Sequence, residues 1–197
     1  MNRNYLLLGA VIVAVIVGVV YLGQRLKNKK LPTGTMNQAT PISNSIGTTQ
    51  TPIVGWPQVK ISTSKGDITL ELRPDVAPKT VANYLGKWSR GECDNRTWHR
   101  VEDWVVQGCD PKGDGTGGNS TLPTETSSEA FTAGAVGVAR QATPKEVSND
   151  SQFFIVKKDS LFLNGEYTFF GRVISGLDVV NQLAIGNKIL STTILSK

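Results

Sequence analysis

The sequence predicts a mainly β domain, in which a β-barrel is capped by two helices, preceded by a single membrane-spanning helix. Three observations support this prediction: an uncharged apolar run near the N-terminus, many short segments in which apolar and polar residues alternate, and two segments with helical periodicity. Short strands with turn-rich joints favour a barrel over a doubly wound sheet. With 197 residues, the chain has room for one such domain besides its N-terminal segments.

The apolar run is YLLLGAVIVAVIVGVVYLG, from Tyr5 to Gly23, and contains no charged residue. About twenty apolar residues suffice for a helix to cross a bilayer. A cleaved signal peptide is the alternative, but the run is long for one and no small-residue cleavage site follows it. We therefore expect residues 1–30 to be an uncleaved transmembrane anchor with a basic flank.

The net charge of +5 comes entirely from this N-terminal segment. Residues 1–30 hold five basic and no acidic side chains, whereas the remainder is balanced, with sixteen of each sign. A basic flank interacts with lipid head groups, and a neutral domain offers no electrostatic footprint for a polyanion, so we expect no nucleic acid partner. By charge alone the flank favours a cytoplasmic position for the part that follows.

Residues 31–57 carry no charge and are rich in Thr, Ser, Asn, Gln, Pro and Gly. This composition buries too little apolar surface to fold, so we expect a flexible linker. Beyond it, Cys93 and Cys109 cannot complete a zinc site with the chain's single histidine, His99. Two alternatives remain open for the cysteines: buried free thiols, or a disulfide that requires an oxidising compartment.

The folded part is expected to begin with a hairpin and a helix. Two alternating runs between Lys60 and Arg73 surround Lys65-Gly66, which is typical of a hairpin. The helix opens at Pro78 and closes at Gly91. One helical face collects Val81, Tyr84, Leu85 and Trp88. Further strands are predicted at 97–101, 104–107, 135–140, 152–156, 169–174 and 189–195, with a second helix at 176–184.

Strand periodicity indicates a half-polar groove. In SQFFIV, Gln152 and Phe154 share one face, so we expect them to be exposed while the alternate pair enters the core. In TWHRV, Trp98 and Arg100 share a face in the same way. The neighbouring acids in EDW, Glu102 and Asp103, point apart on a strand or turn and are expected to form a solvated bend.

A glycine-rich loop, KGDGTGGNS at residues 112–120, has the G-x-G-x-x-G spacing of dinucleotide sites and nearly fits a P-loop. Both nucleotide sites require a helix directly after the glycines. Here STLPTETSSEAFTAG follows, without a helical repeat, and Asn119 stands where a P-loop has lysine. With one histidine, a Ser-His-Asp triad could use only His99, and no G-x-S-x-G elbow accompanies any serine. Any reaction should therefore need neither a nucleophile nor a metal.

Five blocks in this order resemble the signature of the cyclophilin family of peptidyl-prolyl cis/trans isomerases: WHRVEDWVVQGCD, GTGGNS, VAR, SQFFIV and FLNGEYTFFGRV. The resemblance implies a closed antiparallel eight-stranded β-barrel capped by two helices over residues 58–197. It further implies a monomeric enzyme without cofactor or metal, which rotates Xaa-Pro bonds and assists protein folding near a membrane. The alternative is a non-catalytic proline-peptide binding module with the same fold.

The resemblance also assigns roles to individual residues. Arg100 falls on the catalytic arginine, which hydrogen-bonds the prolyl nitrogen as it pyramidalises. The proline ring would occupy a pocket formed by Trp104, Val105, Phe154 and Leu163. Peptide contacts would come from Gln107, Gln152, Ala139 and Arg140, with Phe162 and Tyr167 at the rim. The glycine-rich loop would be the wall of the neighbouring subsite.

The chain departs from the family pattern at several points. The turn after Arg100 is one residue shorter, Trp98 replaces a phenylalanine, and QATPKEVSND is longer than usual. Phe162 and Tyr167 stand where many members have tryptophan and histidine. Loss of an indole N–H donor removes a hydrogen bond, so we expect weak cyclosporin binding. The folding role favours a single-pass membrane protein with its catalytic domain outside the cytoplasm, against the charge rule.

Overall fold

The computed structural model describes residues 55–196 of the chain. The predicted membrane span at residues 5–23 and most of the predicted linker lie outside it. Among residues 55–196, no helix has the length and apolar content needed to cross a bilayer.

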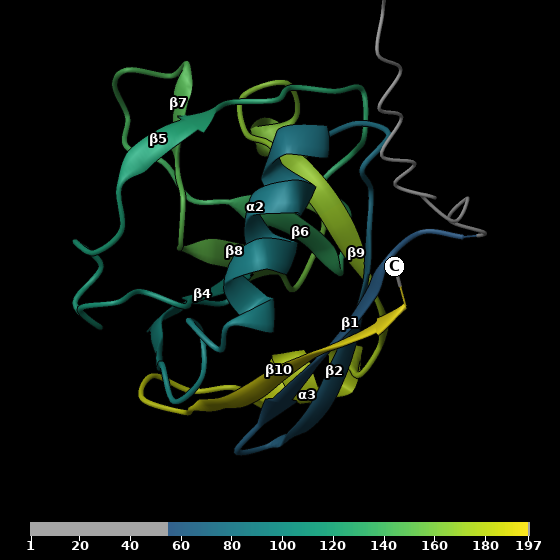
Figure 1. The fold of residues 1–197 in the computed structure, drawn as a ribbon, viewed down its shortest axis with the longest axis vertical. Coiled ribbons are helices and arrows are strands. Elements are labelled where there is room, and N and C mark those ends of the chain that lie inside the picture. Colours follow the sequence, from purple (N-terminus) through teal and green to yellow (C-terminus); the bar gives the residue numbers. More distant parts are fainter. Residues whose placement is uncertain (1–54, 197) are drawn as a thin grey trace, which may run out of the picture. The chain divides into compact units, whose positions relative to one another are not determined.

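An eight-stranded antiparallel sheet forms the body of the domain, in the order β10-β1-β2-β9-β6-β8-β4-β3 (Figure 1). Its strands are β1 (Gln58–Thr63), β2 (Gly66–Leu72), β3 (Trp98–Val101), β4 (Val105–Gly108), β6 (Ala135–Val138), β8 (Phe153–Val156), β9 (Phe169–Ser175) and β10 (Ile189–Ser196). The remaining elements are helix α2 (Pro78–Ser89), helix α3 (Leu177–Gln182), the 3-10 helix η1 (Leu161–Leu163) and a separate two-stranded sheet of β5 (Ser120–Pro123) with β7 (Val147–Asn149). Every strand and helix predicted from the sequence within this part has a counterpart, shifted by a few residues at its ends, whereas β5, β7 and η1 were not predicted.

The two ends of the sheet, β3 and β10, approach each other without forming a ladder. They are linked by an isolated bridge between Thr97 and Lys188 and by the N–H of Trp98, which donates to the carbonyl of Asn187 at 2.9 Å. The structure thus shows a mainly β fold, a curled sheet with two helices. The pairing between β3 and β10 is too limited to show the fully closed barrel that was expected. On its other side, β10 pairs with β1, and Gln58 lies opposite Ser196.

Helix α2 packs its apolar face onto the curled sheet. Pro78 occupies the first turn, where its missing N–H costs nothing, and the buried face includes Val81, Tyr84 and Trp88. The ring of Tyr84 stacks on Phe170 of β9, with centroids 4.7 Å apart, and Trp88 meets Phe153 of β8 edge to face. In Figure 1 this helix crosses in front of β6, and β9 runs beside it. The main hydrophobic core lies between α2 and the sheet.

Strand β8 is buried on both faces, contrary to the expectation that Gln152 and Phe154 would be exposed. Only 3% of Gln152 and 4% of Phe154 are accessible to solvent. Phe153 belongs to the main core, whereas Phe154 belongs to a second apolar cluster with Phe131 and Phe169. The prediction was wrong because loops and η1 cover the face that an isolated strand would leave open.

A bulge in β3 separates Trp98 from Arg100. Trp98 lies opposite Gly108 of β4 and Arg100 opposite Gln107, so His99 is an additional residue in β3. The bulge reverses the expected alternation: Trp98 is fully buried in the core, while the Arg100 side chain is 43% exposed. The expectation that these two residues share a face was therefore wrong. Bulges commonly re-aim a side chain beside a functional site, and this one turns Arg100 outward.

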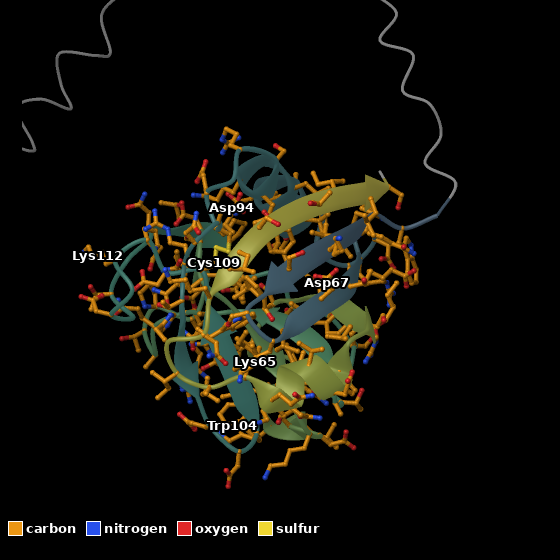
Figure 2. All side chains as sticks on the ribbon, turned by 90° about the horizontal axis from the view of Figure 1, so that it is seen from below. Lys65, Asp67, Asp94, Trp104, Cys109 and Lys112 are labelled. Atoms are coloured by element: carbon orange, nitrogen blue, oxygen red, sulfur yellow. A yellow bond between two sulfur atoms is a disulfide. The ribbon has the colours of Figure 1, made fainter. Side chains whose placement is uncertain are left out.

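Cys93 and Cys109 form a disulfide, with their Cα atoms 5.0 Å apart. The bond joins the turn after α2 to the end of β4, and the two cysteines are 16 positions apart in the sequence. Figure 2 shows Cys109 within the body of the domain and Lys112, on the glycine-rich loop that follows it, at the periphery. Of the two alternatives left open by the sequence, the structure shows the disulfide.

Candidate functional site

A pocket of about 400 Å³ opens where β3, β4, β6 and β8 meet η1. It is lined by His99, Arg100, Trp104, Val105, Gln107, Asp114, Gly115, Ala139, Arg140, Phe154, Leu163 and Tyr167. All predicted site residues except Gln152 and Phe162 line this pocket. The fold thus brings together predicted residues that are up to 67 positions apart along the chain, from Arg100 to Tyr167.

The pocket floor is apolar and rigidly packed. Val105, Phe154 and Leu163 are each at most 4% exposed. The ring of Phe154 stacks on Phe131 with centroids 5.7 Å apart and meets Tyr167 edge to face at 5.8 Å. Gly137 of β6 pairs with Phe154, and a Cβ atom there would lie 2.3 Å from its ring. Glycine at this position therefore lets the phenylalanine lie flat beneath the pocket.

A directional chain of hydrogen bonds leads from the glycine-rich loop to Arg100. The amide nitrogen of Gln152 donates to the carbonyls of Gly115 and Gly117, at 3.1 and 2.7 Å. Its amide oxygen accepts from Gln107 Nε2 at 2.9 Å, and Gln107 Oε1 accepts from Arg100 Nη1 at 3.3 Å. Because the loop offers carbonyls only, each amide has one possible orientation, and Gln107 presents its oxygen to the guanidinium.

Asp110 holds the glycine-rich loop in place. It is 1% exposed, and its carboxylate accepts hydrogen bonds from the N–H groups of Lys112 and Gly115, at 3.2 and 2.7 Å. A Cβ atom at Gly117 would lie 2.0 Å from this carboxylate. The loop forms the wall of a second cavity of about 110 Å³, which shares Gln107, Gly115, Ala139 and Arg140 with the pocket.

Helix α2 supports the start of β8 from behind. The hydroxyl of Tyr84 donates to the carbonyl of Gln152 at 2.9 Å, and Asn83 Nδ2 donates to the carbonyl of Asp150 at 2.8 Å. The Asp150 carboxylate pairs with Lys87 at 3.1 Å and accepts the N–H of Asn119 at 2.6 Å. The same residues of β8 and its preceding turn are therefore fixed by the core and by the loop.

Arg140 and the aromatic rim close the far side. The Arg140 side chain is only 4% exposed; it donates to the carbonyls of Gln141 and Glu166, and its guanidinium lies 4.3 Å from the ring centroid of Tyr167. Phe162 is 68% exposed and contacts Trp104 edge to face at 5.2 Å. Phe162 thus stands on the rim, outside the pocket.

Two predicted peptide contacts are already occupied within the protein. The N–H of Ala139 donates to the carbonyl of Gln152, and its carbonyl accepts from the N–H of Asn149. The Gln152 amide donates to the loop carbonyls and accepts a hydrogen bond from Gln107, and it thereby orients Gln107. Sequence reasoning missed His99 and Asp114 as pocket residues. The glycines on both sides of Asp114 could have indicated that it lies near the pocket. Nothing in the sequence indicates the bulge that places His99 there.

His99 lies half-buried between Arg100 and the glycine-rich loop. Both imidazole nitrogens are buried and have no hydrogen-bond partner within residues 55–196. Burial lowers the pKa of His99 below its ordinary value of 6.5; the positive charge of Arg100 acts in the same direction, and the Asp110 carboxylate opposes it in part. The imidazole is therefore held neutral at pH 7.

Comparison with known proteins shows similarity across this whole domain. The family model described as "Cyclophilin type peptidyl-prolyl cis-trans isomerase/CLD" matches residues 58–195. The "Probable peptidyl-prolyl cis-trans isomerase" of Brucella suis is 38% identical over 163 residues, which cover 75% of this chain and 82% of that protein. "Peptidyl-prolyl cis-trans isomerase cypE" of Dictyostelium discoideum is 41% identical over 130 residues, covering 64% of this chain and 83% of that protein.

Solved structures show the same fold. The crystal structure of a cyclophilin type peptidyl-prolyl cis-trans isomerase from Cryptosporidium parvum superposes with a TM-score of 0.66 at 28% identity, over 72% of this chain and 99% of that one. A second structure of that protein, determined in the presence of the dipeptide Ala-Pro, gives a TM-score of 0.65 at 29% identity, over 71% and 99% of the two chains.

The low pKa of His99 predicts a pH-dependent stability. The unfolded chain binds a proton near pH 6.5 and the folded chain only at lower pH, so the contribution of neutral His99 is complete above pH 6.5 and is lost as the pH falls through the folded-state pKa. We expect a lower free energy of unfolding at pH 5.5 than at pH 7.5, measured by urea titration. His99→Gln should reduce this difference; an unchanged difference would assign it to other groups.

Proposed function

Because this chain belongs to the cyclophilin family of peptidyl-prolyl cis/trans isomerases, we propose that its pocket catalyses rotation about Xaa-Pro bonds of polypeptide substrates. The observation that supports this most is the position of Arg100, whose side chain lines a pocket of about 400 Å³ with an apolar floor. That volume is in the range of small-ligand sites and accommodates a proline ring with its neighbouring backbone.

The chemistry requires only a twist. Resonance gives the Xaa-Pro bond partial double-bond character, and uncatalysed rotation takes tens to hundreds of seconds. As the bond rotates, the prolyl nitrogen becomes pyramidal and recovers a lone pair, which a hydrogen-bond donor stabilises in the transition state more than in the planar ground state. Arg100 supplies such a donor.

The surrounding residues divide the remaining work. The proline ring packs against Val105, Phe154 and Leu163, which exclude water from one side of the reacting bond. Gln107 accepts a hydrogen bond from Arg100 and thereby fixes the guanidinium from the β4 side. No proton is transferred in this reaction, in keeping with a site whose only imidazole is held neutral and without a hydrogen-bond partner within residues 55–196.

Proline-containing polypeptides are the proposed substrates, and the relative solved in the presence of Ala-Pro supports this class. The second cavity, along the glycine-rich loop, extends the pocket toward residues that precede the proline. A proline-peptide binding module without turnover is the alternative function. The retention of Arg100 favours the enzyme, since binding alone can be achieved by the apolar floor.

We expect Arg100→Ala to lower kcat/KM for Xaa-Pro isomerisation by about 10²- to 10³-fold, because it removes the donor to the prolyl nitrogen. The measurement is the isomerisation rate of a proline tetrapeptide with the full-length chain. Arg100→Lys, which keeps the charge but not the planar fork, should recover only a small part of the rate. A folded wild-type protein that binds proline peptides without turnover would establish the binding module instead.

Cyclosporin should bind weakly, because Phe162 offers an exposed aromatic ring but no N–H donor at the rim. We expect Phe162→Trp to tighten cyclosporin binding by about tenfold, the value of one net hydrogen bond at the upper end of its range. Titration calorimetry on the wild type and the variant measures this. Equal affinity in the two proteins would show that the indole donor does not limit binding.

We also propose that residues 1–30 anchor the enzyme in a membrane through a single span, with the domain outside the cytoplasm. The apolar run at residues 5–23 supports the anchor, and the Cys93–Cys109 disulfide supports an oxidising compartment. There the enzyme would assist polypeptides that emerge from translocation. The basic flank argues for the opposite side.

The full-length chain should pellet with membranes after an alkaline carbonate wash, whereas a chain without residues 1–30 should not. Thiol labelling of the same membranes should modify the cysteines only after reduction, because both are in the disulfide. Recovery of the full-length chain in the soluble fraction would exclude the anchor. Labelling without reductant would exclude the oxidising side.

A further inference from the structure

The short turn between β3 and β4 contains two acidic residues to which the proposed function gives no role. The N–H of Glu102 donates to the carbonyl of Val105 at 2.8 Å and closes the turn. Both Glu102 and Asp103 are exposed, as expected of a solvated bend. Their side chains differ, however: of the two, only Glu102 makes side-chain hydrogen bonds with other residues from 55 to 196.

The Glu102 carboxylate bridges two side chains of the pocket. Arg100 Nε donates to Glu102 Oε1 at 2.6 Å, and Trp104 Nε1 donates to Glu102 Oε2 at 2.9 Å. Each carboxylate oxygen therefore has its own partner. The guanidinium carbon of Arg100 also lies 5.4 Å from the ring centroid of Trp104. In Figure 2, Trp104 lies at the periphery of the domain, and the residue is half-buried.

Arg100 is consequently held from two sides. Gln107 accepts from Nη1, and Glu102 accepts from Nε. The remaining nitrogen, Nη2, makes no hydrogen bond to any residue from 55 to 196, so it is available to a bound peptide. An exposed arginine without such partners samples many rotamers, and each must be given up when the transition state forms.

The short turn explains why Glu102 can reach both groups. Arg100 and Glu102 are two residues apart in extended chain, so their side chains leave the backbone on the same face. The turn returns the chain at once, which brings Trp104 back to that face beside them. Arg100 donates a hydrogen bond that, as the largest cause, lowers the pKa of Glu102 below its usual 4.5, with Trp104 contributing, and the carboxylate is ionised at neutral pH.

We propose that Glu102 is a positioning residue for the isomerisation, which fixes the guanidinium of Arg100 and the indole of Trp104 in one arrangement at the pocket mouth. This role rests on the proposed function of the pocket. Glu102 does not touch the reacting bond. It acts through Arg100, which must point at the prolyl nitrogen, and through Trp104, which borders the proline ring.

The test compares Glu102→Gln with Asp103→Asn in the full-length chain. Both variants remove one negative charge from the same turn, but only the first disrupts the bridge, because an amide has a single acceptor oxygen for two donors. We expect Glu102→Gln to lower kcat about three- to tenfold, with KM changed by less than about twofold, as for a partly exposed charge-assisted hydrogen bond. Asp103→Asn should leave both constants unchanged.

An NMR signature separates positioning from a general loss of structure. In Glu102→Gln, the Nε–H resonance of Arg100 and the indole N–H resonance of Trp104 should both shift, while the thermal unfolding midpoint stays within a few degrees of the wild type. Trp104→Phe, which keeps the ring but removes the donor, should shift the Arg100 resonance less. Unmoved resonances in Glu102→Gln, or equal kinetics in the two acid variants, would overturn the proposal.

These outcomes remain distinct from those of the proposed function. If Arg100→Ala abolishes turnover while Glu102→Gln has wild-type kinetics, the isomerase stands and the positioning role falls. If the wild type shows no turnover, the enzymatic role of the pocket falls and, with it, the role of Glu102 in catalysis, whatever the resonances show.

Discussion

The alternation of Phe153 and Phe154 along β8 is the constraint on which the rest of the domain depends. Successive side chains of a strand point to opposite faces, and here both faces are buried. Phe153 contacts Tyr84, Trp88 and Trp98 in the main core, whereas Phe154 forms the pocket floor. Four buried residues, from Phe153 to Val156, thus hold helix α2 on one side and shape the site on the other. A slip of one residue in the register of β8 would exchange the two.

Polar order in the site begins at the same strand. The loop carbonyls fix the amide orientation of Gln152, the residue before β8. Gln152 in turn fixes the amide orientation of Gln107, whose oxygen accepts a hydrogen bond from Arg100. Buried networks of this kind are rigid only when every member has a partner. Here the loop carbonyls, anchored by Asp110, supply the last acceptors. The proposed reaction forms no covalent bond and relies on one donor from Arg100, so it requires a guanidinium that is held in a fixed direction.

Local patterns predicted most of the fold because the long elements have strong periodicity. The hairpin around Lys65-Gly66 and the helix from Pro78 follow from turn chemistry and from the 3.6-residue repeat. Strands β5 and β7 were missed because they are short, mostly polar and paired only with each other. The residues of the pocket could be named only through the resemblance to a family, since they come from segments that no local pattern connects.

Tertiary structure decided the remaining points. The bulge at His99 is invisible in an alternating sequence, so Trp98 and Arg100 were expected on one face. Gln152 and Phe154 were expected to be exposed because the cover over β8 comes from distant segments, among them Phe131 and Tyr167. Glu102 is exposed, as expected, but its two hydrogen-bond partners were not predicted because they meet only when the turn between β3 and β4 is formed. Burial and partnership of polar groups depend on the fold, and a pattern in one segment does not contain them.

The pairing of Gln58 with Ser196 makes the domain a module with a single point of attachment. The chain enters along β1 and leaves along its neighbour β10, and neither strand contributes a residue to the pocket. Adjacent termini are the arrangement in which a domain can be inserted into a loop of another protein, or circularly permuted, without separating its strands. The architecture therefore permits the domain to be attached to other proteins without a change in the pocket, because the strands at the ends of the domain are not the strands that line the pocket.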